Sequence, residues 1–252
     1  MANLYVFHQG IGGENMFLWY SVFDGTNWYP DTQILGTTPS GSNLDLASPP
    51  SAIVWDGVIS VLHQGWFHTV PGAPDGRLWQ TYSTDGADWG SDRLVPNVYL
   101  SESPSAVFYN GLAYVFHQGQ MNDQQLWYTY SPDGTNWGAD TQVPNVGLGE
   151  SPSAVVYNGL LYVFHQGFGD DQQLWYTVFD GENWAPDTQI PNLGMTGSPS
   201  AVAWAGGITV FHQGQMNDGQ LWYTYSPDGT NWGEDTQVPN VGMTASPSAL
   251  VF

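Results

Sequence analysis

The tripeptide His-Gln-Gly occurs five times in this chain, and its spacing constrains the fold more than any other sequence feature. Successive copies begin 55, 54, 48 and 47 residues apart and extend over the whole 252-residue sequence. Self-similarity at a period of about 50 residues indicates an array of structural repeats, each built from one supersecondary unit. We number the repeats one to five after these copies, which begin at His8, His63, His117, His165 and His212.

Each repeat contains four short segments that are rich in aromatic and β-branched residues and are separated by turn residues, as expected for strands. In repeat four the segments cover residues 151–157, 160–166, 174–179 and 184–191. Asn158-Gly159 separates the first two, and Asn-Gly favours a tight hairpin because both residues tolerate positive φ. Asp-Gly-x-x-Trp joins the third and fourth segments in every repeat. A four-stranded antiparallel meander repeated in this way predicts an all-β fold, a five-bladed β-propeller.

The two ends of the sequence predict how the ring closes. The chain begins with the second segment of a repeat, residues 4–9, and ends with a first segment, residues 246–252. Pairing of these two segments would complete the blade of repeat one and remove open sheet edges. We therefore predict a single domain over residues 1–252, folded as a monomeric closed ring.

The charge composition restricts the partners of this chain. Arg77 and Arg93 are its only cationic residues besides histidine, against 23 acidic residues, and the formal net charge is −21. Such a surface repels polyanions and anionic lipid, because it has almost no cations to pair with phosphate. We expect no nucleic-acid partner and no membrane insertion, and we favour a neutral ligand.

Several kinds of site and signal are not expected. The sequence has no cysteine, so disulfides and thiolate metal sites are excluded. Five histidines spread around a ring cannot share one ion, and at most Asp170-Asp171 or Asn217-Asp218 could contribute to a calcium site. We assign no metal ligand and expect no cofactor. The N-terminus resembles neither a signal peptide nor a membrane span. We therefore expect synthesis in the cytoplasm, with release by a non-classical route as an alternative.

Two motifs resemble known propeller families. The segments Ser131–Trp137 and Ser226–Trp232 resemble the Asp-box turn of sialidase-type propellers, with one residue fewer than the usual form. Five blades of this length, each with a polar-aromatic motif, resemble the tachylectin-2-like lectins. That resemblance implies a five-bladed propeller that binds N-acetylhexosamines between its blades. No binding residue is transferred from it by identity.

Strand order divides the connections between two faces. The Asn-Gly and Asp-Gly-x-x-Trp turns share one face, where turn chemistry explains them. The His-Gln-Gly ends, the loops after them and the linkers between repeats share the other. There a histidine, a glutamine, an acidic loop and the Trp of the next strand would gather, and this combination suits the apolar face and hydroxyls of a sugar. The candidate ligand-binding residues are His8, Gln9, Trp19, His63, Gln64, Trp79, His117, Gln118, Asn122, Asp123, Trp127, His165, Gln166, Asp170, Asp171, Trp175, His212, Gln213, Asn217, Asp218 and Trp222.

The repeats are not identical on this face. Asn15 replaces the loop aspartate in repeat one, and repeat two has a longer loop, residues 66–77, which contains His68. The linker over residues 35–47 is also long. These two insertions are expected to cover or alter one site.

Three alternatives to a multivalent lectin for glycans stay open. The His-Gln pairs could be structural hydrogen-bonding groups, and the Trp residues could belong to the packing between blades. The propeller could be a protein-interaction scaffold. A glycoside hydrolase would need an unequal pair of catalytic carboxylates, and Glu14, Glu102 and Glu150, which lack counterparts in other repeats, form no recognisable pair. We therefore expect no enzyme.

Overall fold

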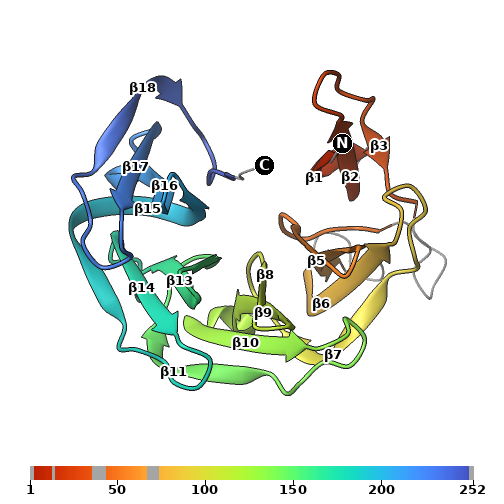
Figure 1. Ribbon diagram of the computed structural model, residues 1–252, viewed down its shortest axis with the longest axis horizontal. Helices are drawn as coiled ribbons and strands as arrows, with labels where there is room; N and C mark the ends of the chain where they lie inside the picture. Colours follow the sequence, from red (N-terminus) through yellow and green to blue (C-terminus); the bar gives the residue numbers. More distant parts are fainter. Residues whose placement is uncertain (1–2, 13–14, 36–43, 67–73, 250–252) are drawn as a thin grey trace.

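The computed structural model describes residues 3–12, 15–35, 44–66 and 74–249. It is an all-β protein whose sheets are arranged radially around a central axis, the β-propeller architecture (Figure 1). In the part of the chain so described, no helix is long and apolar enough to cross a membrane.

Each sheet is an antiparallel meander in which strands adjacent in the chain are adjacent in space. β1 to β3 form a three-stranded sheet, β4 to β7 and β8 to β11 form four-stranded sheets, and β12 to β18 form a seven-stranded sheet. The seven-stranded sheet contains repeats four and five, because β15 runs from the last strand of one into the first strand of the other. The strands are β1(Leu4–Gly12), β2(Asn15–Phe23), β3(Thr32–Gln33), β4(Ser51–Trp55), β5(Val58–Trp66), β6(Pro74–Ser83), β7(Arg93–Tyr99), β8(Ser105–Tyr109), β9(Leu112–Gln118), β10(Gln125–Ser131), β11(Thr141–Gly147), β12(Ser153–Tyr157), β13(Leu160–Gln166), β14(Gln173–Phe179), β15(Thr188–Trp204), β16(Gly207–Gly214), β17(Gln220–Ser226) and β18(Thr236–Gly242).

The turns form as the sequence predicts. Asn158 and Gly159 have φ values of 50° and 75°, the positive values that the tight hairpin between β12 and β13 requires. In the turn between β10 and β11, the Asp133 carboxylate accepts the backbone N–H groups of Thr135 and Asn136 at 2.8 and 2.7 Å. These hydrogen bonds and the Asn136 side chain lower the pKa of Asp133 to about 2.

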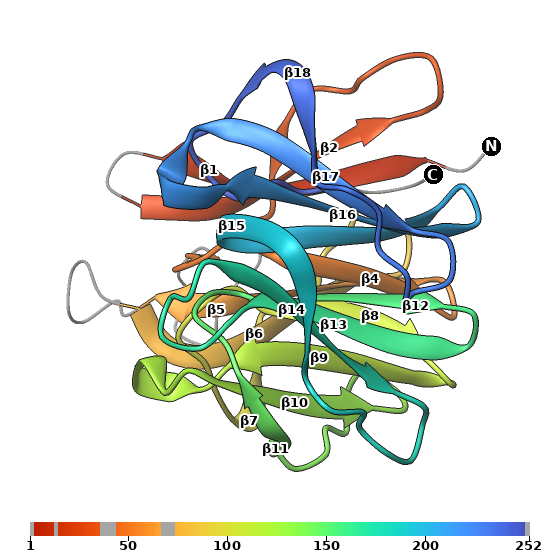
Figure 2. The same cartoon turned by 90° about the vertical axis from the view of Figure 1, so that its left-hand side faces the viewer.

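The Trp of each Asp-Gly-x-x-Trp turn packs against the preceding repeat, except in repeat one. Trp184 of repeat four meets Phe116 of repeat three edge to face, with ring centroids 5.9 Å apart. Trp232 meets Phe164, and Trp89 meets Phe7, in the same way. The core therefore consists of apolar layers between successive repeats. Figure 2 shows the sheets of these repeats stacked on one another.

The first and last repeats face each other across an opening in Figure 1. Within the described residues, no strand pairing joins β1 to the C-terminal segment, and residues 250–252 of the predicted closing strand lie outside them. The Ala249 backbone N–H nevertheless donates to the Ser200 hydroxyl at 2.9 Å, as Ala201 does to Ser153. The segment before residue 250 thus follows the path of an innermost strand.

Candidate ligand-binding site

A cavity of about 630 Å³ lies between repeats three and four. One wall comes from the last strand of repeat three, and the other comes from the loop after His-Gln-Gly, from β14 and from the segment before β15 in repeat four. Its lining residues are Pro144, Asn145, Gly147, Gly167, Phe168, Asp171, Trp175, Trp184, Ala185, Pro186 and Asp187.

A β-bulge builds the wall from repeat three. Trp127 pairs with Gln142 and Gln125 pairs with Gly147, so the register between β10 and β11 shifts and Pro144-Asn145 loops out. Proline has no N–H to donate to the ladder, and Asn145 adopts φ 60°, a left-handed value that asparagine tolerates. Equivalent asparagines in repeats two, four and five have φ values of 61°, 59° and 63° at Asn97, Asn192 and Asn240. The bulge is therefore a repeated feature that turns polar and apolar groups toward the next repeat.

Trp175 presents an indole ring that is held from behind. Its Nε1–H donates to the Asp171 carboxylate at 2.8 Å, and the other Asp171 oxygen accepts the Gln173 backbone N–H at 2.9 Å. The indole N–H is therefore satisfied inside the protein, and the half-buried ring offers a ligand its apolar face. The same Trp–Asp hydrogen bond recurs as Trp79–Asp75, Trp127–Asp123 and Trp222–Asp218.

Repeat one lacks this restraint among the described contacts. Trp19 Nε1 is buried without a hydrogen-bond partner. The Asn15 side chain, which takes the aspartate's place in the sequence, lies outside what the structure describes, as do the two predicted insertions over most of their length, including His68.

The histidine of His-Gln-Gly holds a second carboxylate at the cavity. His165 is buried, and its Nε2 lies 3.0 Å from Oδ1 of Asp187, a cavity-lining residue whose side chain is 15% exposed. His165 Nδ1 lies 3.0 Å from the carbonyl oxygen of Gln166. The histidine thus orients Asp187 from behind, and the rest of that carboxylate stays available to accept hydroxyl hydrogens from a ligand.

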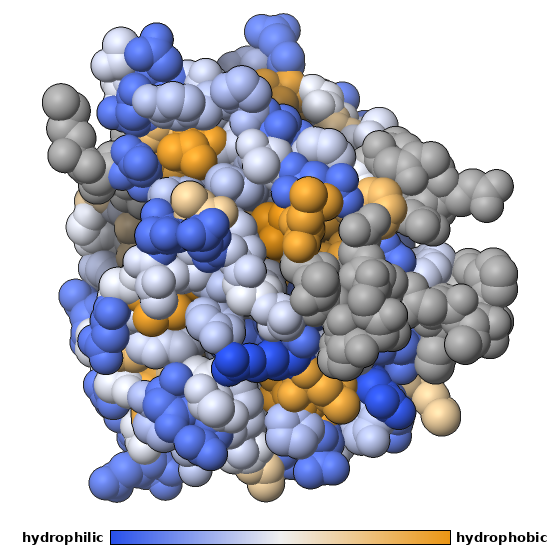
Figure 3. All heavy atoms as spheres, turned by 90° about the vertical axis from the view of Figure 1, so that its right-hand side faces the viewer, coloured by the Kyte–Doolittle hydropathy of each residue, from blue (hydrophilic) through white to orange (hydrophobic). Residues whose placement is uncertain are grey.

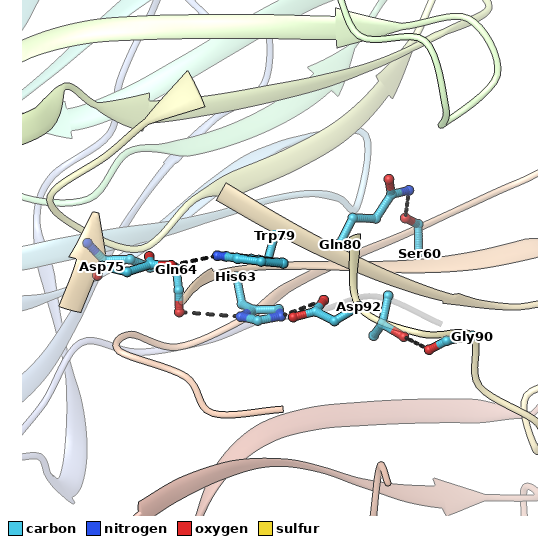
Figure 4. A network of polar contacts seen from close by, with 9 residues as sticks. Ser60, His63, Gln64, Asp75, Trp79, Gln80, Gly90 and Asp92 are labelled. Carbon is cyan, nitrogen blue, oxygen red and sulfur yellow. Dashed lines mark hydrogen bonds and ion pairs between the residues drawn. The ribbon is translucent and has the colours of Figure 1, made fainter. Parts of the chain in front are cut away.

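Figure 4 shows this network in repeat two, where the histidine is His63 and the carboxylate is Asp92. Burial lowers the pKa of His63, but the charge of Asp92 and its hydrogen bond outweigh that effect, and the pKa is raised overall. Both ring nitrogens face oxygen acceptors, so the doubly protonated ring satisfies both contacts. The His63–Asp92 pair therefore lies buried beneath this part of the surface.

The glutamine of His-Gln-Gly fastens the linker between repeats. Gln64 Nε2 donates to the Leu100 carbonyl oxygen at 2.8 Å, and Gln9 and Gln118 bond in the same way to Leu46 and Leu148. Gln166 instead donates to Asp170 and accepts the Gly197 backbone N–H at 3.0 Å. Since Leu148 also pairs with Gly167 of the next repeat, the linker and the cavity loop are held together.

The glycine makes room for the Trp–Asp pair. A Cβ atom on Gly167 would lie 2.3 Å from Asp171 Oδ2, and one on Gly119 or Gly214 would lie 2.6 Å from the Nε1 atom of Trp127 or Trp222. Such approaches exclude any larger residue unless the aspartate moves. In repeat four the histidine therefore supports the cavity wall from behind, the glutamine holds the loop and the linker, and Gly167 itself lines the cavity.

This geometry corrects the role predicted for the His-Gln pairs. We expected them to contact a ligand, but the ring nitrogens and most of the side-chain amides bond to protein groups instead. This applies to His63, Gln64, His117, Gln118, His165, Gln166, His212 and Gln213, which are all buried, while His8 is partly exposed and bonds to Asp31 at 3.0 Å.

Some of the predicted loop residues line the cavity, and others bond to protein groups. Asp171 and Trp175 line the cavity, whereas Asp170 bonds to Gln166. Asn122 and Asn217, in the short 3₁₀ turns η1(Gln120–Asn122) and η2(Gln215–Asn217), dock their backbone N–H groups on the Ser101 and Thr196 hydroxyls.

Sequence reasoning missed two cavity elements, the aspartate opposite the histidine and the Pro-Asn bulge. Both belong to one recurrent signal, Asp-x-x-Val/Ile-Pro-Asn, which begins at Asp92, Asp140, Asp187 and Asp235. A search for polar residues that recur at fixed distances after the Asp-Gly-x-x-Trp turn would have found it.

Two acidic residues interact outside this cavity. Burial, and to a lesser extent the charge of Glu150, raises the pKa of Glu102. Burial and Asp170 likewise raise the pKa of Glu150. Both belong to linkers that precede innermost strands, and neither has an acidic counterpart in the linkers of the other repeats. Among the described residues, no group of three or more His, Asp or Glu is arranged to hold a metal ion.

Comparison with known proteins identifies the fold. No family model and no curated protein matches the chain. The SapL1 lectin in complex with α-methyl fucoside is similar over 94% of this chain and 78% of its own, with a TM-score of 0.65 and 18% identity. A mutant of the Aleuria aurantia lectin in complex with Fucα1-6GlcNAc is similar over 96% and 80%, with a TM-score of 0.61 and 17% identity.

Glycoside hydrolases are similar as well. An α-L-arabinofuranosidase from Clostridium thermocellum gives a TM-score of 0.56 at 16% identity, over 76% of this chain and 72% of its own. The chain spans about half the length, 52%, of two exo-β-1,3-galactanases that it also resembles. At these identities the likeness establishes a shared fold.

Proposed function

We propose that this protein is a carbohydrate-binding protein, a lectin, that holds neutral sugars in cavities between adjacent repeats. One observation carries the proposal: the cavity between repeats three and four combines a fixed indole face with a carboxylate that a buried histidine orients. The parts of this arrangement that the sequence repeats, Trp, Asp and the Pro-Asn bulge, occur at other junctions too.

The chemistry of the cavity fits a pyranose. The C–H face of the sugar stacks on Trp175, and its hydroxyls donate to Oδ2 of Asp187 and bond to the Asn145 amide. No cation lines the cavity, so a neutral sugar is favoured over an acidic one. The structures of SapL1 and of the Aleuria aurantia lectin mutant are complexes with fucosides, and fucose, galactose and N-acetylhexosamines all satisfy this chemistry.

Multivalency would follow from a ring of five blades, which we also propose. In a closed ring, residues 246–252 complete the blade of repeat one, and Trp28 docks on Phe211 and Tyr223 as Trp232 docks on Phe164 and Tyr176. Two observations support closure: Trp28 is 58% exposed, unlike its counterparts, and the buried Ser48 hydroxyl has no hydrogen-bond partner. The Ser103, Ser151 and Ser198 backbone N–H groups each donate to the hydroxyl one repeat onward, and closure would give Ser48 the N–H of Ser246.

A glycoside hydrolase is the second candidate, and the Glu102–Glu150 pair favours it. Carboxylic acids with raised pKa values act as general acids in such enzymes. The pair is unique to two linkers, as an asymmetric catalytic set would be. Turnover of a chromogenic glycoside that Glu102→Gln and Glu150→Gln abolish, but Trp175→Ala does not, would support the hydrolase and contradict the lectin.

Isothermal titration calorimetry with simple sugars tests the lectin. We expect exothermic binding of at least one of methyl α-L-fucoside, methyl galactoside and N-acetylglucosamine, with more than one site per chain. Trp175→Ala should remove one site and Trp222→Ala another. No heat with any of these sugars, beside capture of a single protein partner, would instead support a scaffold.

A further inference from the structure

Phe168 distinguishes the cavity between repeats three and four from its neighbours. The ring lines the cavity and is 62% exposed. It rests on Gly147, where an added Cβ atom would lie 3.0 Å from the Phe168 Cβ atom. An exposed aromatic side chain held in this way presents apolar surface directly to whatever occupies the cavity.

Repeat five carries Gln215 at the equivalent position. Gln215 lies over Gly194 as Phe168 lies over Gly147, and the bulges before these glycines match, Pro191-Asn192 against Pro144-Asn145. Repeat three carries Gln120 at this position, but at the junction between repeats two and three the residue equivalent to Gly147 is Tyr99. The junction between repeats four and five is therefore the closest matched comparison.

The loop backbones at the two matched junctions are alike. Gly169 and Asp170 have φ values of 69° and 58°, and Met216 and Asn217 have values of 58° and 52°. The Gly169 N–H donates to the Gln124 side-chain oxygen at 3.2 Å, and the Met216 N–H donates to that of Gln172 at 3.2 Å. The two sites thus differ in their side chains, with Phe in one and Gln in the other, on a common scaffold.

We propose that Phe168 makes the cavity between repeats three and four selective for sugars that carry a methyl group, either the C6 methyl of a 6-deoxyhexose or the methyl of an N-acetyl group. This inference rests on the proposed lectin function. Phe168 and Trp175 offer apolar surface from two elements, and a methyl group that fills the space beside Phe168 is removed from water. Burial of one such group increases affinity roughly 4- to 10-fold, an advantage that Gln215 cannot supply.

Calorimetry with matched sugar pairs tests this proposal. Methyl α-L-fucoside and methyl α-L-galactoside differ by a methyl against a hydroxymethyl group, and N-acetylglucosamine and glucose differ by the acetamido group. The first pair reports the 6-deoxy source and the second reports the N-acetyl source. We expect one site of the wild-type chain to prefer the methyl-bearing member of one pair roughly 4- to 10-fold.

Two reciprocal variants locate the effect, and both change exposed side chains. Phe168→Gln should abolish the preference, and Gln215→Phe should create a second preferring site. Sugar binding that persists with the same preference in Phe168→Gln overturns this inference while leaving the proposed function intact. Failure of all four sugars to bind the wild-type chain contradicts the proposed function itself.

Discussion

Gly167→Ala is the substitution that most sharply tests why the repeated tripeptide ends in glycine. The new Cβ atom would lie 2.3 Å from Asp171 Oδ2 and 2.6 Å from Asp171 Cγ, well inside contact distance. The Asp171 side chain cannot move away without breaking hydrogen bonds, because its two oxygens accept the Trp175 indole N–H and the Gln173 backbone N–H. The backbone of Gly167 is not in the left-handed region, so the effect is steric.

We expect this overpacking and the loss of the Trp175 hydrogen bond to reduce the free energy of unfolding by about 2–3 kcal/mol. For a chain of this size the loss corresponds to a fall in Tm of about 5–10 °C. Urea and thermal unfolding followed by tryptophan fluorescence measure both, and sugar titration should show one site fewer.

Gly138→Ala is the matched control. Its Cβ atom would meet the nearest atoms at 3.4–3.5 Å, an ordinary contact, and its backbone is also outside the left-handed region. Its stability should change by less than about 1 kcal/mol. If Gly167→Ala unfolds at the same urea concentration as the wild type, the supporting role assigned to this glycine is wrong.

The remaining predictions concern the histidines, the Asp-Gly-x-x-Trp turns and the closure of the ring between repeats five and one. His165→Ala should leave the Asp187 carboxylate without its partner and cost about 2–3 kcal/mol in urea unfolding, whereas an unchanged midpoint would show that the pair is dispensable. The pKa of His63 is raised in the folded chain, so its stabilising contribution should be fully present below the unfolded pKa of about 6.5 and be lost as pH rises through the folded pKa. If the free energy of unfolding of His63→Gln varies with pH as that of the wild type does, this prediction is wrong. Asp133, with a pKa of about 2, should cap its turn above the unfolded pKa of about 3.9 and lose that contribution as pH falls toward 2, and an NMR titration midpoint near 4 would oppose it. In a closed ring Trp28→Ala and Trp232→Ala should each reduce the free energy of unfolding by about 3 kcal/mol, whereas replacing an exposed Trp28 would cost less than about 0.5 kcal/mol.

Much of the fold followed from the sequence, because its information is local and repeated. Asn158-Gly159 specifies a hairpin by its own backbone preferences, and the Asp-Gly-x-x-Trp turns form as their turn residues predict. The β-propeller arrangement needed only the period and the four-segment pattern. Pairing of the two ends was predicted from the same pattern and stays a prediction, because it depends on contacts at opposite ends of the chain and residues 250–252 lie outside the described residues.

The site was predicted less completely, because a repeated polar residue can face a ligand or support a residue that does. His165 and Gln166 lie at the end of a strand, and sequence alone did not reveal that Asp187 and the linker occupy their polar atoms. Trp175 and Asp171 line the cavity, and their contact with a ligand stays a prediction. The Pro144-Asn145 wall belongs to the preceding repeat, and only the packing of one repeat on the next brings it to Trp175.

A crystal structure of the protein soaked with a sugar that binds in calorimetry tests the central claim most directly. We predict that the sugar lies between repeats three and four, with its apolar face on the Trp175 ring and a hydroxyl within hydrogen-bonding distance of Asp187. His165 should remain behind Asp187 without touching the sugar. A sugar bound instead beside Glu102 and Glu150, or on the face of the Asp-Gly-x-x-Trp turns, would contradict the sugar site proposed between repeats three and four.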